Sequence, residues 1–237
     1  MRAESYDRIA NEYYDPRHIT SRNFDEASEN AFADRRFQTS SHGLVLEVGA
    51  GRGCARKYCG TDPSRLVQTD ISEEMLALTP REDFLIALRC DALDMPFVPE
   101  SFSTVLAFLY DPFNLAPFYF EVSRVLKTGG VFVGTLPHHT WGATLRKTIG
   151  YHLNKTKFRL FLSHSGEYIE LDSFLMDDME ITQALTDAGM AVIEMADLKL
   201  PESVGTISPH IKIPAKALGV TPYDLPIVKL IVARKTS

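Results

Sequence analysis

Three closely spaced glycines and a later aspartate have the types and spacing to bind a nucleotide. The apolar run 44–48, which is typical of a buried strand, is followed by Gly49, Gly51 and Gly53. Glycine lets the backbone turn sharply and approach a ligand without a Cβ in the way. Asp70 ends the next apolar run, where a carboxylate can accept hydrogen bonds from ribose hydroxyls. The spacing therefore predicts a nucleotide pocket at the carboxyl ends of two strands.

The glycine spacing and one acidic residue narrow the choice of nucleotide. The dinucleotide fingerprint needs Gly-x-Gly-x-x-Gly, whereas the third glycine here comes one residue early and Cys54 takes its place. Glu47, just before the glycines, would disfavour a pyrophosphate but not a ligand with an ammonium or sulfonium group. This stretch therefore favours S-adenosylmethionine over NAD.

Alternating strands and helices are expected to position these residues. Between residues 44 and 136 the expected strands are 44–48, 66–70, 84–89, 104–110 and 131–136. Helices of the intervening length imply an α/β fold with a parallel sheet and helices on both faces. The helix before the fifth strand is expected to end at Gly129-Gly130.

The segments outside this core predict a lid and two insertions. The expected elements are helices 5–14, 22–37, 141–151 and 178–188, a hairpin over 157–163 and 168–173, and strands 191–196 and 227–234. The proline-rich stretch 201–226 has no clear period and is expected to be irregular. We therefore expect an N-terminal helical lid over 1–43 and a main domain over 44–237. Its insertions at about 138–177 and 200–226 would form a substrate cap.

Composition excludes several classes of protein. The 237 residues are 45% hydrophobic and 24% charged, as in ordinary globular proteins. The net charge of −6 leaves no broad basic field for duplex nucleic acid. The three cysteines lack the paired spacing of a metal site, so no metal ligands are expected. The N-terminus has no apolar signal core, and no run approaches the roughly 20 residues of a membrane span, so we expect a cytoplasmic protein that does not bind membranes.

Four sequence blocks resemble the class I S-adenosylmethionine-dependent methyltransferases, a group that includes the ubiquinone and menaquinone biosynthesis methyltransferases. The blocks are Leu46–Gly53, Thr69–Leu76, Cys90–Phe97 with Ser101-Phe102, and Arg124–Gly130. Tyr6-Asp-Arg-Ile-Ala and Tyr13-Tyr-Asp15 also resemble the lid of that group. The resemblance implies a Rossmann-like class I methyltransferase fold, with a mostly parallel seven-stranded sheet, helices on both faces and an antiparallel last strand.

The same resemblance implies which residues bind S-adenosyl-L-methionine. The methionine end would be lined by Glu47, Gly49, Ala50, Gly51 and Gly53. Asp70 would hold the ribose hydroxyls and Ile71 the adenine face, and the adenine edge would meet Asp91 and Ala92. Met75 and Tyr13 complete the expected cofactor set.

Candidates for catalysis and acceptor binding follow the fourth and fifth expected strands. Tyr110-Asp-Pro-Phe-Asn114 partly resembles the Asp-Pro-Pro-Tyr box of amino-methyltransferases that act on adenine, although Asp-Pro with Asn is also common turn chemistry. Asp111 is therefore a candidate catalytic residue, and Tyr110 and Asn114 are candidate substrate contacts. Either His138 or His139 could act as a base near neutral pH, and Trp141 could form an apolar wall.

Two further stretches carry candidate substrate contacts. Tyr14 and His18 belong to a stretch that either folds over the cofactor or merely packs on the sheet. A basic cluster, which is either a solvated face or a site for an anionic substrate, consists of Arg146, Lys147, His152, Lys155, Lys157 and Arg159.

These features predict an S-adenosylmethionine-dependent methyltransferase that acts on a small-molecule acceptor by in-line transfer. A general base is needed only if the acceptor must lose a proton early. One open alternative is a nucleobase or nucleotide N-methyltransferase, suggested by Asp111, Asn114 and the basic cluster. The other is a non-catalytic S-adenosylmethionine-binding regulatory protein. A homodimer is also compatible with the sequence.

Overall fold

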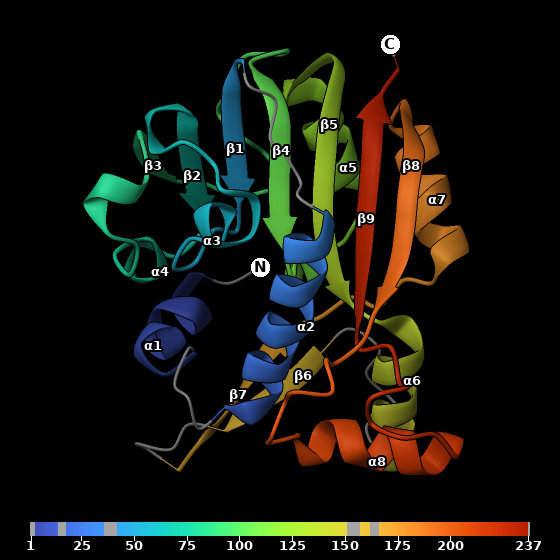
Figure 1. The fold of residues 1–237 in the computed structure, drawn as a ribbon. Helices are drawn as coiled ribbons and strands as arrows, with labels where there is room; N and C mark the ends of the chain where they lie inside the picture. The colour runs from blue at the N-terminus through green and yellow to red at the C-terminus, as the bar shows by residue number, and fades with distance from the viewer. Residues whose placement is uncertain (1–2, 14–17, 36–41, 151–156, 162–165, 237) are drawn as a thin grey trace.

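A computed structural model, which describes residues 3–13, 18–35, 42–150, 157–161 and 166–236, places a seven-stranded sheet at the centre of the protein (Figure 1). Its strand order is β3-β2-β1-β4-β5-β9-β8. Neighbouring strands are parallel from β3 to β5, whereas β9 is antiparallel to both β5 and β8. The strands are β1 (Leu44–Val48), β2 (Leu66–Asp70), β3 (Ile86–Arg89), β4 (Phe102–Phe108), β5 (Leu126–Pro137), β8 (Met190–Leu198) and β9 (Val228–Lys235). The expected fold class is therefore confirmed.

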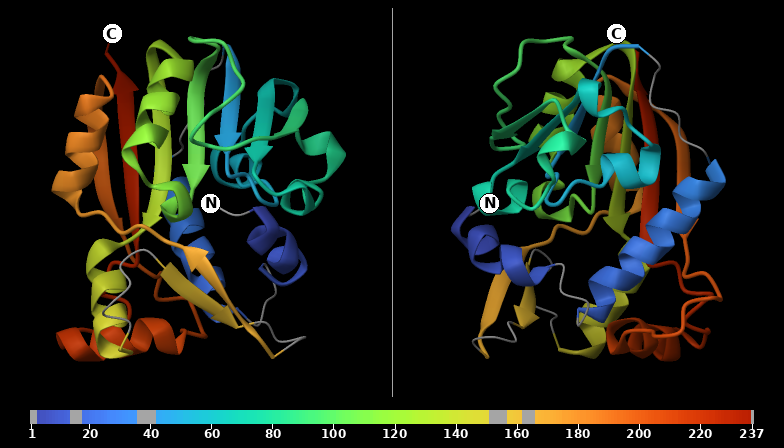
Figure 2. Two further views of the ribbon diagram at one scale, coloured as in Figure 1. Left: turned by 180° about the vertical axis from the view of Figure 1, so that it is seen from behind. Right: turned by 60° about the vertical axis from the view of Figure 1, so that its left-hand side comes forward.

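Helices cover both faces of the sheet, so its central strands are almost completely buried. One face packs against α2 and α3, and the other against α5 and α7 (Figure 2). The helices are α1 (Ala3–Tyr13), α2 (Ile19–Arg35), α3 (Ala55–Cys59), α4 (Glu73–Leu76), α5 (Ala116–Val125), α6 (His139–Thr148), α7 (Asp178–Asp187) and α8 (Pro209–Leu218). Burial on both sides explains why β1, β2 and β4 read as nearly continuous apolar runs.

The additional elements gather at one end of the sheet. Helices α1, α6 and α8 and the hairpin of β6 (Lys157–Phe161) and β7 (Tyr168–Asp172) lie beyond the carboxyl ends of the parallel strands (Figure 1). Ligands of open α/β sheets bind at this end. The additions are thus placed around the expected pocket.

Two predictions about local structure are wrong. The stretch 201–226 was expected to be irregular, but it contains α8, which is capped by Ser208 and begins at Pro209. Proline suits the first turn of a helix, and the other prolines of this stretch obscured the period. Helix α5 ends at Val125 rather than at the two glycines, because Leu126 already pairs with Phe102 of β4.

Gly53 provides a test of how tightly the glycine turn packs against β2. Its φ is +80°, and a Cβ there would lie 2.6 Å from Nε2 of Gln68, whereas Gly60 has φ +59° and open space around it. Both Gly→Ala changes cost the left-handed backbone, about 1–2 kcal/mol. We expect Gly53→Ala to lower the free energy of unfolding by about 1–3 kcal/mol more, as measured by urea denaturation. Equal losses for the two variants would contradict this packing.

Candidate cofactor-binding site

A cavity of about 250 Å³ lies at the carboxyl ends of the parallel strands, between the sheet and the N-terminal helices. Its floor comes from the glycine turn, from the residues after β2 and from the ends of β4 and β5. Its cover comes from α1, α2 and His18 just before α2. The cavity is therefore enclosed by segments that are far apart in the sequence.

Asp70 lies at the end of β2 and connects this strand to the glycine turn. Its Oδ2 accepts a hydrogen bond from the backbone N–H of Gly51 at 3.0 Å, and its Oδ1 accepts one from Ser72 at 2.9 Å. Burial raises the pKa of Asp70 above its usual value. Each carboxylate oxygen has a second lone pair, so this cavity-lining side chain can still accept hydrogen bonds from a ligand.

Glu47 is almost completely buried beneath the same turn, and its carboxylate binds protein groups. Its Oε1 accepts hydrogen bonds from the backbone N–H groups of Cys54 and Ala55 at 2.7 and 2.9 Å, and Oε2 accepts one from Gln68 at 2.8 Å. Burial raises the pKa of Glu47 to about 7. Glu47 lines the cavity, and these contacts make it the side chain that fixes the start of α3.

Most of the residues that the resemblance assigned to the cofactor lie together. The structure brings to the cavity Tyr13, Glu47, Gly49, Ala50, Gly51, Asp70, Ile71, Met75 and Ala92. Gly53 and Asp91 do not line it. Gly53 faces Gln68 instead, and the side chain of Asp91 accepts a hydrogen bond from the N–H of Leu93 at 3.0 Å.

The N-terminal helices contribute lining residues that sequence reasoning missed. Besides the expected Tyr13 and His18, the cavity is lined from this side by Tyr6, Ser21, Arg22, Asp25 and Ser28. Burial raises the pKa of Tyr6 and of Tyr13, so both phenols stay protonated at neutral pH. The polar residues on α2 recur every three or four positions, so they lie on one side of the helix. This spacing was the signal in the sequence that could have identified them as lining residues. Tyr14 lies outside the described residues.

Tyr110 and Asn114, the expected acceptor contacts after β4, are buried in the core and do not line the cavity. The hydroxyl of Tyr119 donates to Oδ1 of Asn114 at 2.6 Å and lies 3.1 Å from the hydroxyl of Tyr110. The amide of Asn114 donates to the carbonyl of Phe174 at 3.0 Å. Their neighbours Pro112 and Phe113 do reach the cavity.

Asp111 is buried at the contact between β4 and the hairpin rather than in the cavity lining. Its carboxylate is hydrogen-bonded to Ser173, which also accepts a hydrogen bond from Arg146 at 2.8 Å. Its carbonyl accepts a hydrogen bond from the N–H of Phe174 at 2.8 Å. Burial raises the pKa of Asp111 to about 7. Asp111 therefore holds the segment after β7 through both its carboxylate and its backbone carbonyl.

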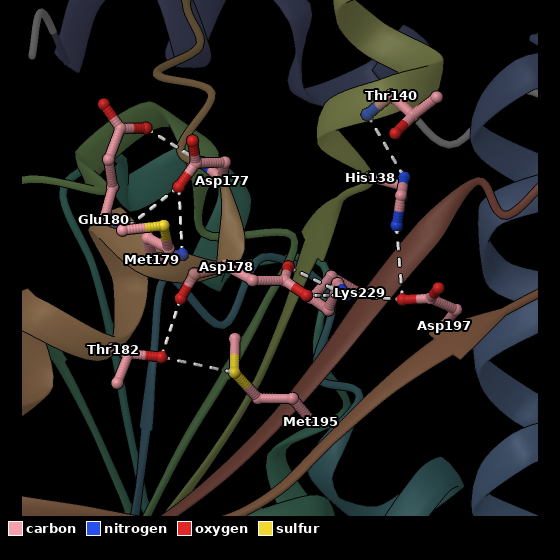
Figure 3. Close-up of polar contacts among 10 residues, drawn as sticks. All are labelled: His138, Thr140, Asp177, Asp178, Met179, Glu180, Thr182, Met195, Asp197 and Lys229. Carbon is pink, nitrogen blue, oxygen red and sulfur yellow. Dashed lines mark hydrogen bonds and ion pairs between the residues drawn. The ribbon is translucent and has the colours of Figure 1, made fainter.

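His138 follows β5 and points toward Asp197 of β8 (Figure 3), and it does not line the cavity. Its Nδ1 accepts a hydrogen bond from the N–H of Thr140 at 3.2 Å, and its Nε2 lies 3.2 Å from Oδ1 of Asp197. Since Nδ1 accepts, the ring proton is on Nε2 and points to the carboxylate. Lys229 completes the cluster by bridging Asp197 and Asp178. His138 thus caps α6.

His139 and Trp141 also lie outside the cavity lining. His139 is the first residue of α6. The indole N–H of Trp141 donates to the carbonyl of His210 at 2.9 Å, and its ring meets Phe24 edge-on with the centroids 4.9 Å apart. Trp141 therefore joins α6 to α8 and α2. The structure brings neither histidine to the expected site of the reaction.

The described residues provide neither a clustered metal site nor a helix that could span a membrane. Within the described ranges there is no group of three or more His, Cys, Asp or Glu side chains that could hold a metal ion. None of the described helices has the length and apolar character needed to cross a membrane.

Comparison with protein families identifies the domain that contains the glycine turn. Residues 46–134 match the family described as "Methyltransferase domain". A search of curated proteins found no match. The matched residues run from within β1 to within β5 and include the glycine turn and Asp70, whereas the lining residue Thr135 of β5 lies one position beyond them.

Solved structures share the fold at low sequence identity. A chain from the Haloferax volcanii complex that contains the Trm112 methyltransferase activator has a TM-score of 0.71 and 19% identity, with 100% of both chains covered. An S-adenosylmethionine-dependent methyltransferase from Mesorhizobium loti has a TM-score of 0.59 and 18% identity, with 89% of this chain and 99% of that chain covered. The geranyl diphosphate C-methyltransferase of Streptomyces coelicolor, solved with S-adenosyl-L-homocysteine, has a TM-score of 0.60 and 17% identity, with 89% and 79% covered.

The raised pKa of Asp111 predicts a pH-dependent stability. Its carboxyl has a pKa of about 7 in the folded protein against 3.8 ordinarily, so ionisation of this group disfavours the folded state as the pH rises from about 4 to about 7. We expect Asp111→Asn to gain stability relative to the wild type over this range, by up to about 4 kcal/mol. Urea denaturation of both proteins at pH 5 and pH 8 measures this. A difference that does not change with pH would contradict it.

Proposed function

We propose that this chain, which carries a class I S-adenosylmethionine-dependent methyltransferase domain, transfers a methyl group to a small molecule bound in the same cavity. The observation that carries the proposal is the enclosure of Asp70 and the glycine turn beneath α1 and α2. Because helices cover the cavity, a small acceptor suits it better than a segment of a macromolecule. The additions at the carboxyl ends of the strands would form the substrate cap.

The lining residues fit the cofactor. Asp70 can accept hydrogen bonds from ribose hydroxyls, and the apolar Ile71 and Ala92 suit an adenine ring. The glycine turn would take the methionine portion. Gly49 has φ +63°, and a Cβ there would lie 2.8 Å from the ring of Phe113, so the turn and this ring form one close-packed wall. When bound, S-adenosylmethionine supplies a methyl group on a cationic sulfur.

The protein's own contribution would be to orient the reactants and exclude water. Orientation of two reactants can lower a barrier by roughly 7–11 kcal/mol. On the side of β4 and β5 the lining is mainly apolar, with Phe108, Leu109, Pro112 and Phe113, and Thr135 is its polar member. This lining supports an acceptor with a substantial apolar part. With His138 and His139 outside the lining, in-line transfer to an acceptor that needs no early loss of a proton is the simplest scheme.

The alternative of nucleobase N-methylation loses its support. It depended on Asp111 and Asn114, whose polar groups hold the segment after β7. The basic cluster is also partly engaged, because Arg146 binds Ser173 and Lys157 is paired with Asp172. His152 and Lys155 lie outside the described residues. No contact in the described cavity lining favours a nucleobase over another small acceptor.

A protein partner is a further proposal for this chain. The Haloferax volcanii structure is a complex with a methyltransferase activator, so assays of this chain should include candidate protein partners. A homodimer stays a prediction, which light scattering on the purified protein would test.

Asp70 gives the direct test of the cofactor site. Asp70→Asn keeps the shape of the side chain but removes the charge and one pair of acceptor sites, so affinity for S-adenosylhomocysteine should fall by about 1.5–3 kcal/mol. Isothermal titration measures the change. The matched control is Asp62→Asn, an exposed carboxylate that caps a turn outside the cavity.

The same titration separates the competing functions. Binding of NAD in place of S-adenosylhomocysteine would overturn the proposal. Binding of the cofactor without methyl transfer to any member of a small-molecule panel would favour the regulatory alternative.

A further inference from the structure

The segment that follows β7 is held between two parts of the main domain. We refer to residues 173–175 as the anchor segment, because they lead from the β6–β7 hairpin back toward α7. Nη2 of Arg146 in α6 donates hydrogen bonds to the carbonyl and to the hydroxyl of Ser173 at 3.0 and 2.8 Å. The N–H of Phe174 donates to the carbonyl of Asp111 at 2.8 Å. The anchor segment is therefore fixed between α6 and the residues after β4.

The contacts of the anchor segment are buried and include two opposite charges. Ser173 and Asp111 are both buried, and the Ser173 hydroxyl is hydrogen-bonded to the Asp111 carboxylate, whose pKa the nearby charge of Arg146 lowers against the effect of burial. Hydrogen bonds that involve a charged group are the stronger ones in proteins. Leu175 packs directly on α6, since a Cβ at Gly142 would lie 2.6 Å from its Cδ1. Arg146 is thus at the centre of a firm attachment.

The hairpin in turn supports helix α1. Ile169 and Leu171 alternate along β7, so they face the same side of the hairpin. They form a buried apolar cluster with Ile9 and Ala10 of α1 and with Met75 of α4. Figure 2 shows α1 beside the hairpin, beyond the edge of the sheet. The position of α1 therefore depends on the position of β7.

The side of α1 that packs on the hairpin also closes the cavity. Tyr6 and Tyr13 lie about one turn before and after Ile9, so the three share one side of the helix. Both tyrosines pack against the apolar cluster, and both line the cavity. Ser72 donates a hydrogen bond to Asp7 at 2.5 Å, which gives α1 a second attachment away from the hairpin. A shift of β7 would therefore loosen α1 on one side.

We propose that Arg146 is a positioning residue for the cofactor cavity, and that it acts through the anchor segment and β7 to hold α1 closed over the ligand. Arg146 itself lies outside the cavity lining, so its effect on a ligand is indirect. The inference rests on the proposed function only in naming the cofactor as the ligand that α1 covers. It gives the insertion after β5 a role in retaining the cofactor, besides that of a substrate cap.

Amide hydrogen exchange of the ligand-free protein, followed by mass spectrometry, tests this path directly. Arg146→Met removes every donor of the side chain, so the amides of α1 should exchange roughly 5- to 50-fold faster than in the wild type. The amides of α2, which is held in the main core, should keep their rates. Arg146→Lys retains the charge and a donor, so it should accelerate α1 less, and it serves in the same comparison if Arg146→Met does not fold.

Arg65→Met is the matched control for hydrogen exchange. Arg65 is also partly buried and donates to a backbone carbonyl, that of Gly43 at 3.2 Å, but it lies at the start of β2 and outside the cavity lining. It should leave the exchange of α1 unchanged. Unchanged exchange of α1 in both Arg146 variants, or equal acceleration of α1 and α2, would overturn the inference.

A double-mutant cycle on S-adenosylhomocysteine binding shows whether Arg146 acts through α1. Arg146→Met and Ile9→Ala should each weaken binding by roughly 3- to 30-fold in isothermal titration. If both act by loosening α1, the double variant should bind about as weakly as the weaker single variant. A loss equal to the product of the two single losses would contradict the path. A wild-type protein that does not bind S-adenosylhomocysteine would overturn the proposed function, whereas hydrogen exchange would still decide the inference.

Discussion

The site depends on one buried carboxylate. The carboxylate of Glu47 is buried, and both of its oxygens accept hydrogen bonds. One oxygen accepts from the first backbone N–H groups of α3, and the other accepts from the side chain of Gln68 in β2. The N-terminus of a helix offers unpaired N–H groups and favours negative charge. Glu47 therefore joins β1, the start of α3 and β2 in one contact. The glycine turn lies between these points, so its shape is set before any ligand binds.

Asp70, which lines the cavity, makes a second set of hydrogen bonds to the glycine turn. Through Gly51 and Ser72 it ties the glycine turn to the start of α4. Burial raises the pKa of both Glu47 and Asp70, because an ionised carboxylate loses hydration there. A ligand with cationic groups relieves this cost. The buried carboxyl groups thus agree with the charge argument that the sequence provided.

The sequence predicts well what depends on neighbours along the chain and poorly what depends on distant contacts. The glycine turn and Asp70 are recognisable because strand ends and turns are local, and parallel strands bring them together. The roles of Asp111, Asn114 and His138 were not predictable, because each is decided by a segment far away in sequence, such as Ser173 or Asp197. The same polar residues that suit catalysis also suit the docking of an insertion. Which of these two roles a polar residue takes depends on the residue that it contacts in the folded protein.

The two helices that cover the cavity are held by different kinds of contact. Helix α2 is anchored by fully buried Asn23, which exchanges hydrogen bonds with Thr206 and Ser208 at 3.0 and 2.9 Å, and by an apolar side in the main core. Helix α1 packs on a small separate cluster, and its ion pair between Arg8 and Glu167 is mostly exposed to solvent. Exposed ion pairs contribute little to stability, and segments with few buried contacts open at the lowest cost. Helix α2 is therefore held in the main core, whereas α1 is held over the cavity by a separate apolar cluster and by the hydrogen bond that Ser72 donates to Asp7.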